Sequence, residues 1–306
     1  MHFLQTAPWQ SFQDKLDRQT FRQSGDGWEY LATLEHGKGN TRLYCPYGPR
    51  ASNESAFREA ITSLASLGKE LGVTFLRIEP TEAAWANLLK TEGWRKVTYQ
   101  SLNPEHTITI DLNQPEDLIV SEMSQPARNI YRNYHKKDLE VKTSSDPADI
   151  GIFLDLIHQV SQKTGMRPHS DSYFQTQAES LFPAGAAKLW YVNHQNKPIA
   201  AALLYDGPDA RYYAHAAADS SPELRKLNAG TALVAEAIID AKRAGLKSFD
   251  LYGIAPEGSS KDHPWYGFTR FKKSFGGEET TFAGSWDLPL KPLGYWIYRT
   301  YQTIRK

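Results

Sequence analysis

The sequence predicts an α+β protein built from two copies of one unit, and three observations support this prediction. The chain has 306 residues, of which 40% are apolar and 12% aromatic, so it is long enough for two domains and too apolar to be mainly disordered. A helical stripe that ends at a glycine and leads into an apolar strand occurs twice, and the two glycines, Gly72 and Gly245, lie 173 residues apart. The elements around each pair follow the same order, which favours duplication over coincidence.

The first copy begins with two predicted strands between Trp28 and Tyr44, joined by a turn at residues 36–40. Apolar residues at steps of three and four then form one stripe of a helix: Phe57, Ile61, Leu64, Gly68 and Leu71. Gly72 ends this helix, residues 73–80 form a buried strand that stops at a proline, and a short helical segment covers residues 85–93.

The second copy repeats this plan. Two strands are predicted between Lys188 and Tyr205, with a turn at residues 194–198. A helical stripe follows, formed by Leu233, Ala237, Ile238 and Ala241. The helix stops near Gly245, residues 246–252 form a strand, and a short helical segment covers residues 268–276.

The boundary between the copies is predicted near residue 102, because a new strand opens at residues 103–112 after a turn signal. We therefore predict a first domain over residues 1–102 and a second over 103–288. The aromatic tail at residues 289–306 is predicted to be a helix that packs back onto the first domain. Residues 291–306 carry four basic residues and no acid, so contact with the anionic inner leaflet of a membrane is the alternative.

Composition excludes several classes of protein. Lys and Arg number 35, as do Asp and Glu, so no overall charge draws the chain to a polyanion. A single cysteine, Cys45, and an N-terminus without a basic start or an apolar run favour the reducing cytoplasm. The longest strongly apolar stretch, residues 198–205, is too short to span a bilayer. The histidines show no ligand spacing, so no metal is expected, and Cys45 fits strand packing better than nucleophilic catalysis.

Two basic segments are candidates for binding phosphates or nucleic acid. Arg128, Arg132 and Lys136 recur every four residues, which places them on one helix face that either is simply solvated or binds phosphate. In residues 267–277, three cations alternate with three phenylalanines: Arg270, Lys272 and Lys273 with Phe268, Phe271 and Phe275. Cations among aromatic rings suit unpaired nucleotides, although the same spacing fits the core stripe of a helix.

A group of tyrosines lies in the second copy: Tyr212, Tyr213, Tyr252 and Tyr266. Tyrosines at strand ends can line a ligand slot with their hydroxyl groups directed at the ligand, although about half of these four are expected to be ordinary core residues.

The order of elements resembles the fold of acyl-CoA-dependent N-acyltransferases (GNAT). That fold cradles the pyrophosphate of CoA on a glycine-rich loop at a helix N-terminus. The best match here is Arg225–Gly230, in which Asn228 occupies the position of the first glycine, and the equivalent stretch of the first copy, residues 50–55, has no glycine. The damaged signature predicts that CoA is not used.

The chain resembles the FemABX aminoacyltransferases over nearly its whole length. The matching stretches are residues 44–49, 75–80, 103–112, 128–141, 249–254 and 267–277. The resemblance implies an α+β fold of two tandem GNAT-like domains, each a mixed or antiparallel sheet flanked by helices, in the compact form without a coiled-coil arm. It also implies a monomer that takes an amino acid from aminoacyl-tRNA, without CoA or metal, and extends peptidoglycan cross-bridges.

The resemblance also places the substrates and the site residues. The tRNA 3′ end would enter the second domain, and UDP-MurNAc-peptide or lipid II would bind in a cleft between the two domains. Phe271 and Lys272 take the positions of the family's Phe-Lys pair, with the lysine facing the tRNA end or developing charge. Arg128 and Arg132 take the positions of the basic helix, and Tyr213 that of the second-domain tyrosine.

Arg22 lies near the position of the family's early lysine, which helps to hold the diphosphate of the precursor. Asp138 stands where many members have glycine. Tyr252 and Glu79 complete the predicted substrate-binding set, and Glu79 and Asp250 are the candidate proton acceptors unless the substrate itself accepts the proton. The alternatives are an acyl-CoA-dependent N-acyltransferase and a non-catalytic module that binds RNA or the precursor.

Overall fold

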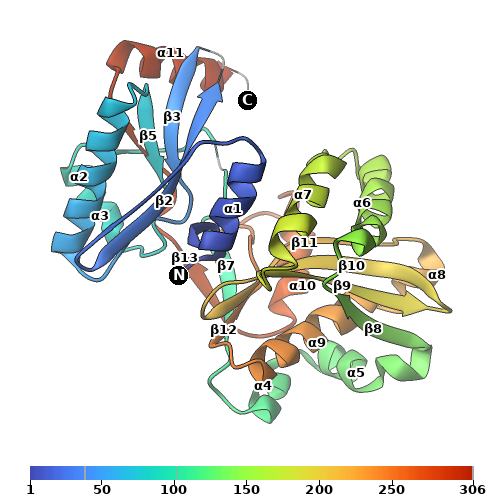
Figure 1. Ribbon diagram of the computed structural model, residues 1–306. Coiled ribbons are helices and arrows are strands. Elements are labelled where there is room, and N and C mark those ends of the chain that lie inside the picture. The colour runs from blue at the N-terminus through green and yellow to red at the C-terminus, as the bar shows by residue number, and fades with distance from the viewer. Residues whose placement is uncertain (38, 101, 305–306) are drawn as a thin grey trace. The chain divides into compact units, whose positions relative to one another are not determined.

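The computed structural model describes residues 1–37, 39–100 and 102–304, and its contacts divide the chain into two units. Unit 1 comprises Met1–Glu105 and Thr281–Lys306, and unit 2 comprises His106–Thr280. Each unit is a mixed sheet flanked by helices, so the predicted α+β class is confirmed (Figure 1).

The sheet of unit 1 has the strand order β1-β2-β3-β5-β14-β6, with β4 paired to β2. Its strands are β1 (Thr20–Gly25), β2 (Trp28–Gly37), β3 (Asn40–Cys45), β4 (Arg50–Ala51), β5 (Phe75–Ile78), β6 (Arg95–Lys96) and β14 (Trp286–Pro289). β3 and β5 run parallel, whereas the other neighbours described are antiparallel. The predicted turn between β2 and β3 includes residue 38, which lies outside the described residues.

The helices of unit 1 are η1 (Phe3–Gln5), α1 (Ala7–Lys15), α2 (Glu54–Glu70), α3 (Trp85–Thr91) and α11 (Pro292–Ile304). Alternation along β5 shows how two of them cover the sheet: Leu76 packs in the core with α2, and Phe75 packs with Tyr295 and Tyr298 of α11. α2 and α11 therefore lie on opposite faces. Gly72 has φ +62° after α2, the left-handed conformation expected where a glycine ends a helix.

The C-terminal segment enters unit 1 as a strand before it forms a helix. β14 pairs with β5 on one side and with β6 on the other, so it is an interior strand of the sheet. The predicted second domain, residues 103–288, therefore extends too far, because Trp286 is buried in the core of unit 1. Sequence periodicity detected the aromatic helix but not this four-residue strand. Residues 305–306 of the predicted tail lie outside the described residues.

The sheet of unit 2 has the order β13-β7-β12-β11-β10-β9-β8. Its strands are β7 (His106–Asp111), β8 (Leu139–Ser144), β9 (Ala187–His194), β10 (Lys197–Asp206), β11 (Ala210–Ala218), β12 (Ser248–Asp250) and β13 (Glu278–Thr281). Its helices are α4 (Glu116–Glu122), α5 (Gln125–Asn133), η2 (Tyr134–Lys137), η3 (Pro147–Asp149), α6 (Ile150–Thr164), α7 (Asp171–Leu181), α8 (Pro222–Arg225), α9 (Ala229–Arg243) and α10 (Tyr266–Lys273). α9 packs across the sheet on one face, and α6 and α7 cover the other (Figure 1).

The two units share one local plan, although the predicted pairing of hairpins needs correction. In unit 1 the antiparallel pair β2–β3 leads through α2 into β5, which is parallel to β3. In unit 2 the antiparallel pair β10–β11 leads through α9 into β12, which is parallel to β11. The counterpart of β2–β3 is therefore β10–β11 and not the predicted pair within residues 188–205. No helix in the described part of the chain is both long and apolar enough to cross a bilayer.

Candidate active site

A pocket of about 630 Å³ lies in unit 2, where two parallel strands part. β11 and β12 pair only over the three positions Ala210↔Ser248 to Tyr212↔Asp250. Beyond Tyr212, β11 continues to Ala218, whereas the chain after β12 stays bonded to β7 through the N–H groups of Leu251 and Ile254 and no longer pairs with β11. The parting exposes the side of β11, and α10 and the first turns of α9 form the other walls.

Small side chains and a β-bulge keep this pocket open. Leu203 pairs with His215 and Leu204 with Tyr213, so Ala214 has no partner across the ladder, and the strand bends there. Six of the lining residues are alanines: Ala200, Ala201, Ala214, Ala216, Ala217 and Ala218. The remaining lining residues are Tyr213, Arg225, Gly230, Leu233, Pro264, Gly267, Phe268, Phe271 and Lys272.

Lys272 supplies a charge at the wall of the pocket. It lies in the last turn of α10, and its Nζ donates hydrogen bonds to the carbonyl oxygens of Tyr252 (3.0 Å) and Gly253 (2.7 Å). These two bonds use two of the three donors of an ammonium group. Burial lowers the pKa of Lys272 to about 8, an effect that Asp250 opposes. The side chain therefore remains mainly an ammonium ion at pH 7.

The backbone beside Lys272 has an unusual conformation that Asp250 supports. Tyr252 has φ +59°, a left-handed conformation that is strained for a residue with an aromatic side chain. Its N–H donates to Oδ1 of Asp250 at 2.6 Å, and the hydroxyl of Thr107 donates to the same oxygen. Burial raises the pKa of Asp250 to about 6, although these hydrogen bonds and the charge of Lys272 act to lower it. Asp250 thus fixes the turn that presents two carbonyls to Lys272.

Two other predicted residues also line the pocket. Tyr213 lies on β11 beside the bulge, and burial raises the pKa of its hydroxyl, which stays neutral at pH 7. Phe271 packs edge-on against Phe275, with ring centroids 5.1 Å apart, and Phe275 is fully buried. Phe268 is 64% exposed at the pocket, so the phenylalanine series is not a simple core stripe.

The loop before α9 keeps a left-handed residue although it lacks the first glycine of the CoA signature. Asn228 has φ +61°, a conformation that asparagine tolerates better than other side chains. Arg225 and Gly230 line the pocket, and a Cβ atom built on Gly230 would meet nothing within 4 Å. The substitution at Asn228 therefore leaves the backbone turn intact.

The basic helix does not present the predicted row of cations. α5 ends at Asn133, so Lys136 falls in η2 instead of continuing the face of Arg128 and Arg132. The guanidinium of Arg128 donates to the carbonyl oxygens of Ser121 and Met123, at the end of α4. Arg132 is exposed on α5, and neither arginine lines the pocket.

Asp138 follows this segment with φ +57°, the backbone conformation for which glycine is usual.

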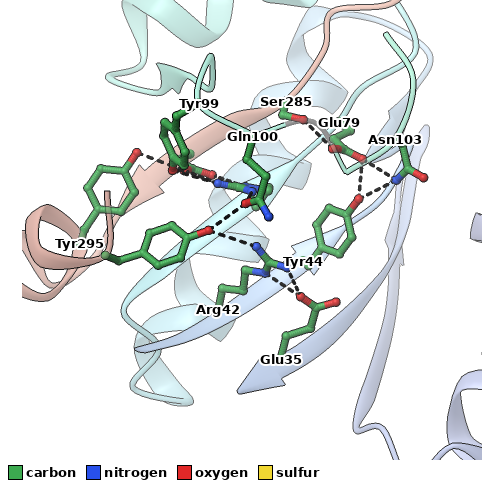
Figure 2. Close-up of polar contacts among 12 residues, drawn as sticks. Glu35, Arg42, Tyr44, Glu79, Tyr99, Gln100, Asn103, Ser285 and Tyr295 are labelled. Atoms are coloured by element: carbon green, nitrogen blue, oxygen red, sulfur yellow. Dashed lines mark hydrogen bonds and ion pairs between the residues drawn. The ribbon is translucent and has the colours of Figure 1, made fainter. Parts of the chain in front are cut away.

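Glu79 and Arg22 belong to unit 1 and have other partners. Glu79 is buried, and its carboxylate accepts hydrogen bonds from Tyr44 (2.6 Å), Asn103 (2.8 Å) and Ser285 (2.5 Å), as Figure 2 shows. Burial raises its pKa. Arg22 on β1 donates to Gln10 and to the carbonyl oxygen of Gln5. Both side chains therefore hold unit 1 together in this structure.

Comparison with solved structures identifies the fold. A structure described as the crystal structure of FemX matches with a TM-score of 0.86 and 16% sequence identity, covering 97% of this chain and 94% of that one. The chain has a FemX-like fold.

Two further solved structures resemble the fold of this chain with lower similarity. One is the C-terminal domain (DUF2156) of a proposed lysylphosphatidylglycerol synthetase from Agrobacterium fabrum, with a TM-score of 0.62, 10% identity and coverage of 97% of this chain and 92% of that one. The other is L-PGS from Bacillus licheniformis, with a TM-score of 0.59, 13% identity and coverage of 98% and 96%.

Sequence comparison finds a match over a stretch that includes all the residues lining the pocket. Residues 124–272 match the model of the acetyltransferase (GNAT) domain, a span that reaches from the start of α5 to Lys272. The match supports an acyltransferase of the GNAT type. No curated protein matches the chain in sequence.

Sequence reasoning missed the strand that forms the pocket wall. β11 is rich in alanine and has no β-branched residue, so its sequence favours neither strand nor turn strongly. It also missed Thr107, whose role depends on the pairing of β7 with β12. The pair Tyr212 and Tyr213 was the available signal for β11, because tyrosines at strand ends can line a ligand slot.

Proposed function

We propose that the chain is an aminoacyltransferase that moves an amino acid from aminoacyl-tRNA to an amine of a peptidoglycan precursor, either UDP-MurNAc-peptide or lipid II. The observation that carries the proposal is Lys272, an ammonium group held by two carbonyls at the wall of a pocket, in a chain with a FemX-like fold. In this proposal the terminal nucleotide of the tRNA occupies the pocket of unit 2.

The proposed reaction exchanges an ester for an amide. The acceptor nitrogen forms a bond to the ester carbonyl carbon, and the bond from that carbon to the ribose oxygen breaks. One proton leaves the nitrogen, and one ends on the ribose oxygen. The protein must orient two large substrates and stabilise the negative charge that develops on the carbonyl and ribose oxygens.

Lys272 is suited to stabilising this charge. Its third donor is not used by the bonds to Tyr252 and Gly253, and its position in a low-dielectric wall strengthens its attraction to an oxyanion. Tyr213 on β11, which is neutral, supplies a hydroxyl group at the same pocket for orientation.

The proton acceptor in this proposal is the substrate. Asp250 and Glu79 are both buried and already accept two and three hydrogen bonds, respectively. A base must lie within hydrogen-bond reach of the proton that it removes, and neither carboxylate is among the residues that line the pocket beside Lys272. In this proposal a phosphate or carboxylate of the precursor therefore accepts the proton.

The test is transfer of a radiolabelled amino acid from a mixture of charged tRNAs to UDP-MurNAc-peptide and, separately, to lipid II. Mild alkali distinguishes the product, because it hydrolyses the aminoacyl ester and spares the amide. We expect an alkali-stable labelled precursor. Its formation would also exclude a non-catalytic binding module. Absence of this product with both acceptors contradicts the proposal.

An acyl-CoA-dependent N-acyltransferase is the second candidate, and two observations favour it. Residues 124–272 match the acetyltransferase domain, and Asn228 preserves the left-handed turn at the head of α9. Isothermal titration with acetyl-CoA separates the candidates. Micromolar binding supports the second candidate, whereas the aminoacyltransferase is expected to show none.

A further inference from the structure

Helix α11 has two apolar faces: one packs on the sheet of unit 1, and the other is exposed among the described residues. Tyr295 and Tyr298 are buried against Phe75 of the sheet, with ring centroids 5.3 and 4.8 Å away. These contacts hold the inner side of the helix on unit 1.

The outer face exposes large apolar side chains in a regular series. Leu293, Trp296, Ile297, Tyr301 and Ile304 are between 53% and 80% exposed. They recur at steps of three and four residues, so they share one side of the helix. Five of the nine exposed large hydrophobic residues in the described chain lie on this one helix, and such a concentration marks an interaction surface.

The charged side chains of this segment have one sign. Between residues 288 and 304 the charged residues are Lys291 and Arg299, both exposed, and there is no Asp or Glu. Glu35 shares a groove with Ile297 and Tyr301, but its carboxylate is paired with Arg42. Trp296 and Tyr301 are residues that favour the boundary between headgroups and acyl chains.

We propose that the outer face of α11 docks unit 1 on an anionic membrane surface, with the helix lying in the plane of the interface. An apolar face bordered by basic residues fits an anionic bilayer through both hydrophobic burial and electrostatic attraction. A second copy of the chain is disfavoured as occupant, because two such helices would bring like charges together. The inference does not depend on the proposed aminoacyl transfer, since docking requires no catalysis.

The test is co-sedimentation of the full chain with vesicles of phosphatidylcholine alone or of phosphatidylcholine and phosphatidylglycerol in equal parts. We expect binding only to the anionic vesicles, weakening as salt is raised. Trp296→Glu together with Ile304→Glu removes apolar area at exposed sites and is expected to weaken binding at least about tenfold. Arg299→Gln is expected to weaken it about fivefold, the effect of about 1 kcal/mol per basic residue near the surface.

Leu118→Glu is the matched control, because Leu118 is an exposed apolar residue of α4 in unit 2. It should bind vesicles as the unchanged chain does, and circular dichroism melting should show that all variants are folded. The proposal is overturned if anionic vesicles are not bound at low salt, or if the α11 variant binds them like the control. It is also overturned if light scattering shows a dimer that the α11 variant dissociates.

Discussion

Lys272 is a charged group with a defined place, and its removal tests the proposed transfer directly. Lys272→Ala takes away the ammonium at the pocket wall and leaves Phe271 and the carbonyls of Tyr252 and Gly253 in place. Loss of one preorganised donor to an oxyanion slows reactions by roughly 100-fold. We therefore expect single-turnover transfer from charged tRNA to slow by about that factor.

The adjacent lysine provides the control. Lys273 pairs with Glu279 at the surface and does not line the pocket, so Lys273→Ala should transfer at the rate of the unchanged chain. A change of less than about threefold in the Lys272→Ala variant, well under the tenfold equivalent to 1.36 kcal/mol, would contradict the assigned role.

The pKa of Lys272 predicts how the rate depends on pH. In the proposed transfer the charged form of Lys272 stabilises the oxyanion, so the single-turnover rate should fall as pH rises through about 8. Asp250 favours the ammonium form, and Asp250→Asn removes its negative charge. The descending limb of the pH profile should therefore move to lower pH in this variant.

Glu279→Gln is the matched change for this experiment, since it neutralises a carboxylate that pairs with Lys273 instead. Its profile should coincide with that of the unchanged chain. If the descending limb of the pH profile does not move in the Asp250→Asn variant, then Asp250 does not stabilise the charged form of Lys272.

At the residue scale, the sequence could predict the parts of the site that lie close together along the chain. Phe271 and Lys272 are neighbours on one short helix, and both line the pocket. Arg128 and Arg132 also fall on one helix as the spacing predicts, but the sequence does not show that Arg128 binds the carbonyls at the end of α4. Such partners depend on how the chain turns between helices.

At the scale of elements, the register of β5 and β14 rests on a buried ion pair. Arg77 and Asp287 are opposite each other in the ladder, are fully buried and form two hydrogen bonds of 2.7 and 2.9 Å. Tyr99 and Tyr295 also donate to Asp287. The pair links a strand near the start of the chain to one near its end.

Arg77→Met is expected to destabilise unit 1 strongly. Removing one partner leaves a buried carboxylate without its cation, which costs about 3–5 kcal/mol in comparable pairs. The measurement is the free energy of unfolding in urea. A double variant, Arg77→Met with Asp287→Leu, should lose less than the single one, because no unpaired charge remains.

Arg95→Met is the control for this change. Arg95 opposes Asp287 from the other neighbouring strand, β6, but it is exposed and lies 5.9 Å from the ring of Tyr295. Its loss should cost no more than about 1 kcal/mol. Equal losses in the Arg77 and Arg95 variants would show that burial of the pair is not the cause.

The elements that the sequence predicts well are those with strong periodicity and clear stops. The stripe of α2 and the glycine that follows it are both local signals, and the same holds for α9. β11 and β14 escape prediction because one is mostly alanine and the other is only four residues long. Their strand conformation comes from pairing with distant strands.

At the scale of the whole molecule, unit 2 is inserted into unit 1 in sequence. A chain shortened to end at Thr280 lacks β14 and α11, including Trp286 of the core of unit 1. We expect residues 1–105 of this variant to become sensitive to proteolysis while His106–Thr280 stays resistant. Limited digestion with mass spectrometry measures both.

A chain that lacks only residues 305–306 is the control and should resist digestion throughout. If the first 105 residues remain equally resistant without Thr281–Lys306, then β14 is not needed to complete unit 1.

The place of β14 between β5 and β6 also has a consequence for biosynthesis. A ribosome delivers all of His106–Thr280 before it adds Trp286–Pro289, so unit 2 can mature first. The nascent first 105 residues must wait, with the gap beside β5 unfilled, until translation is almost finished.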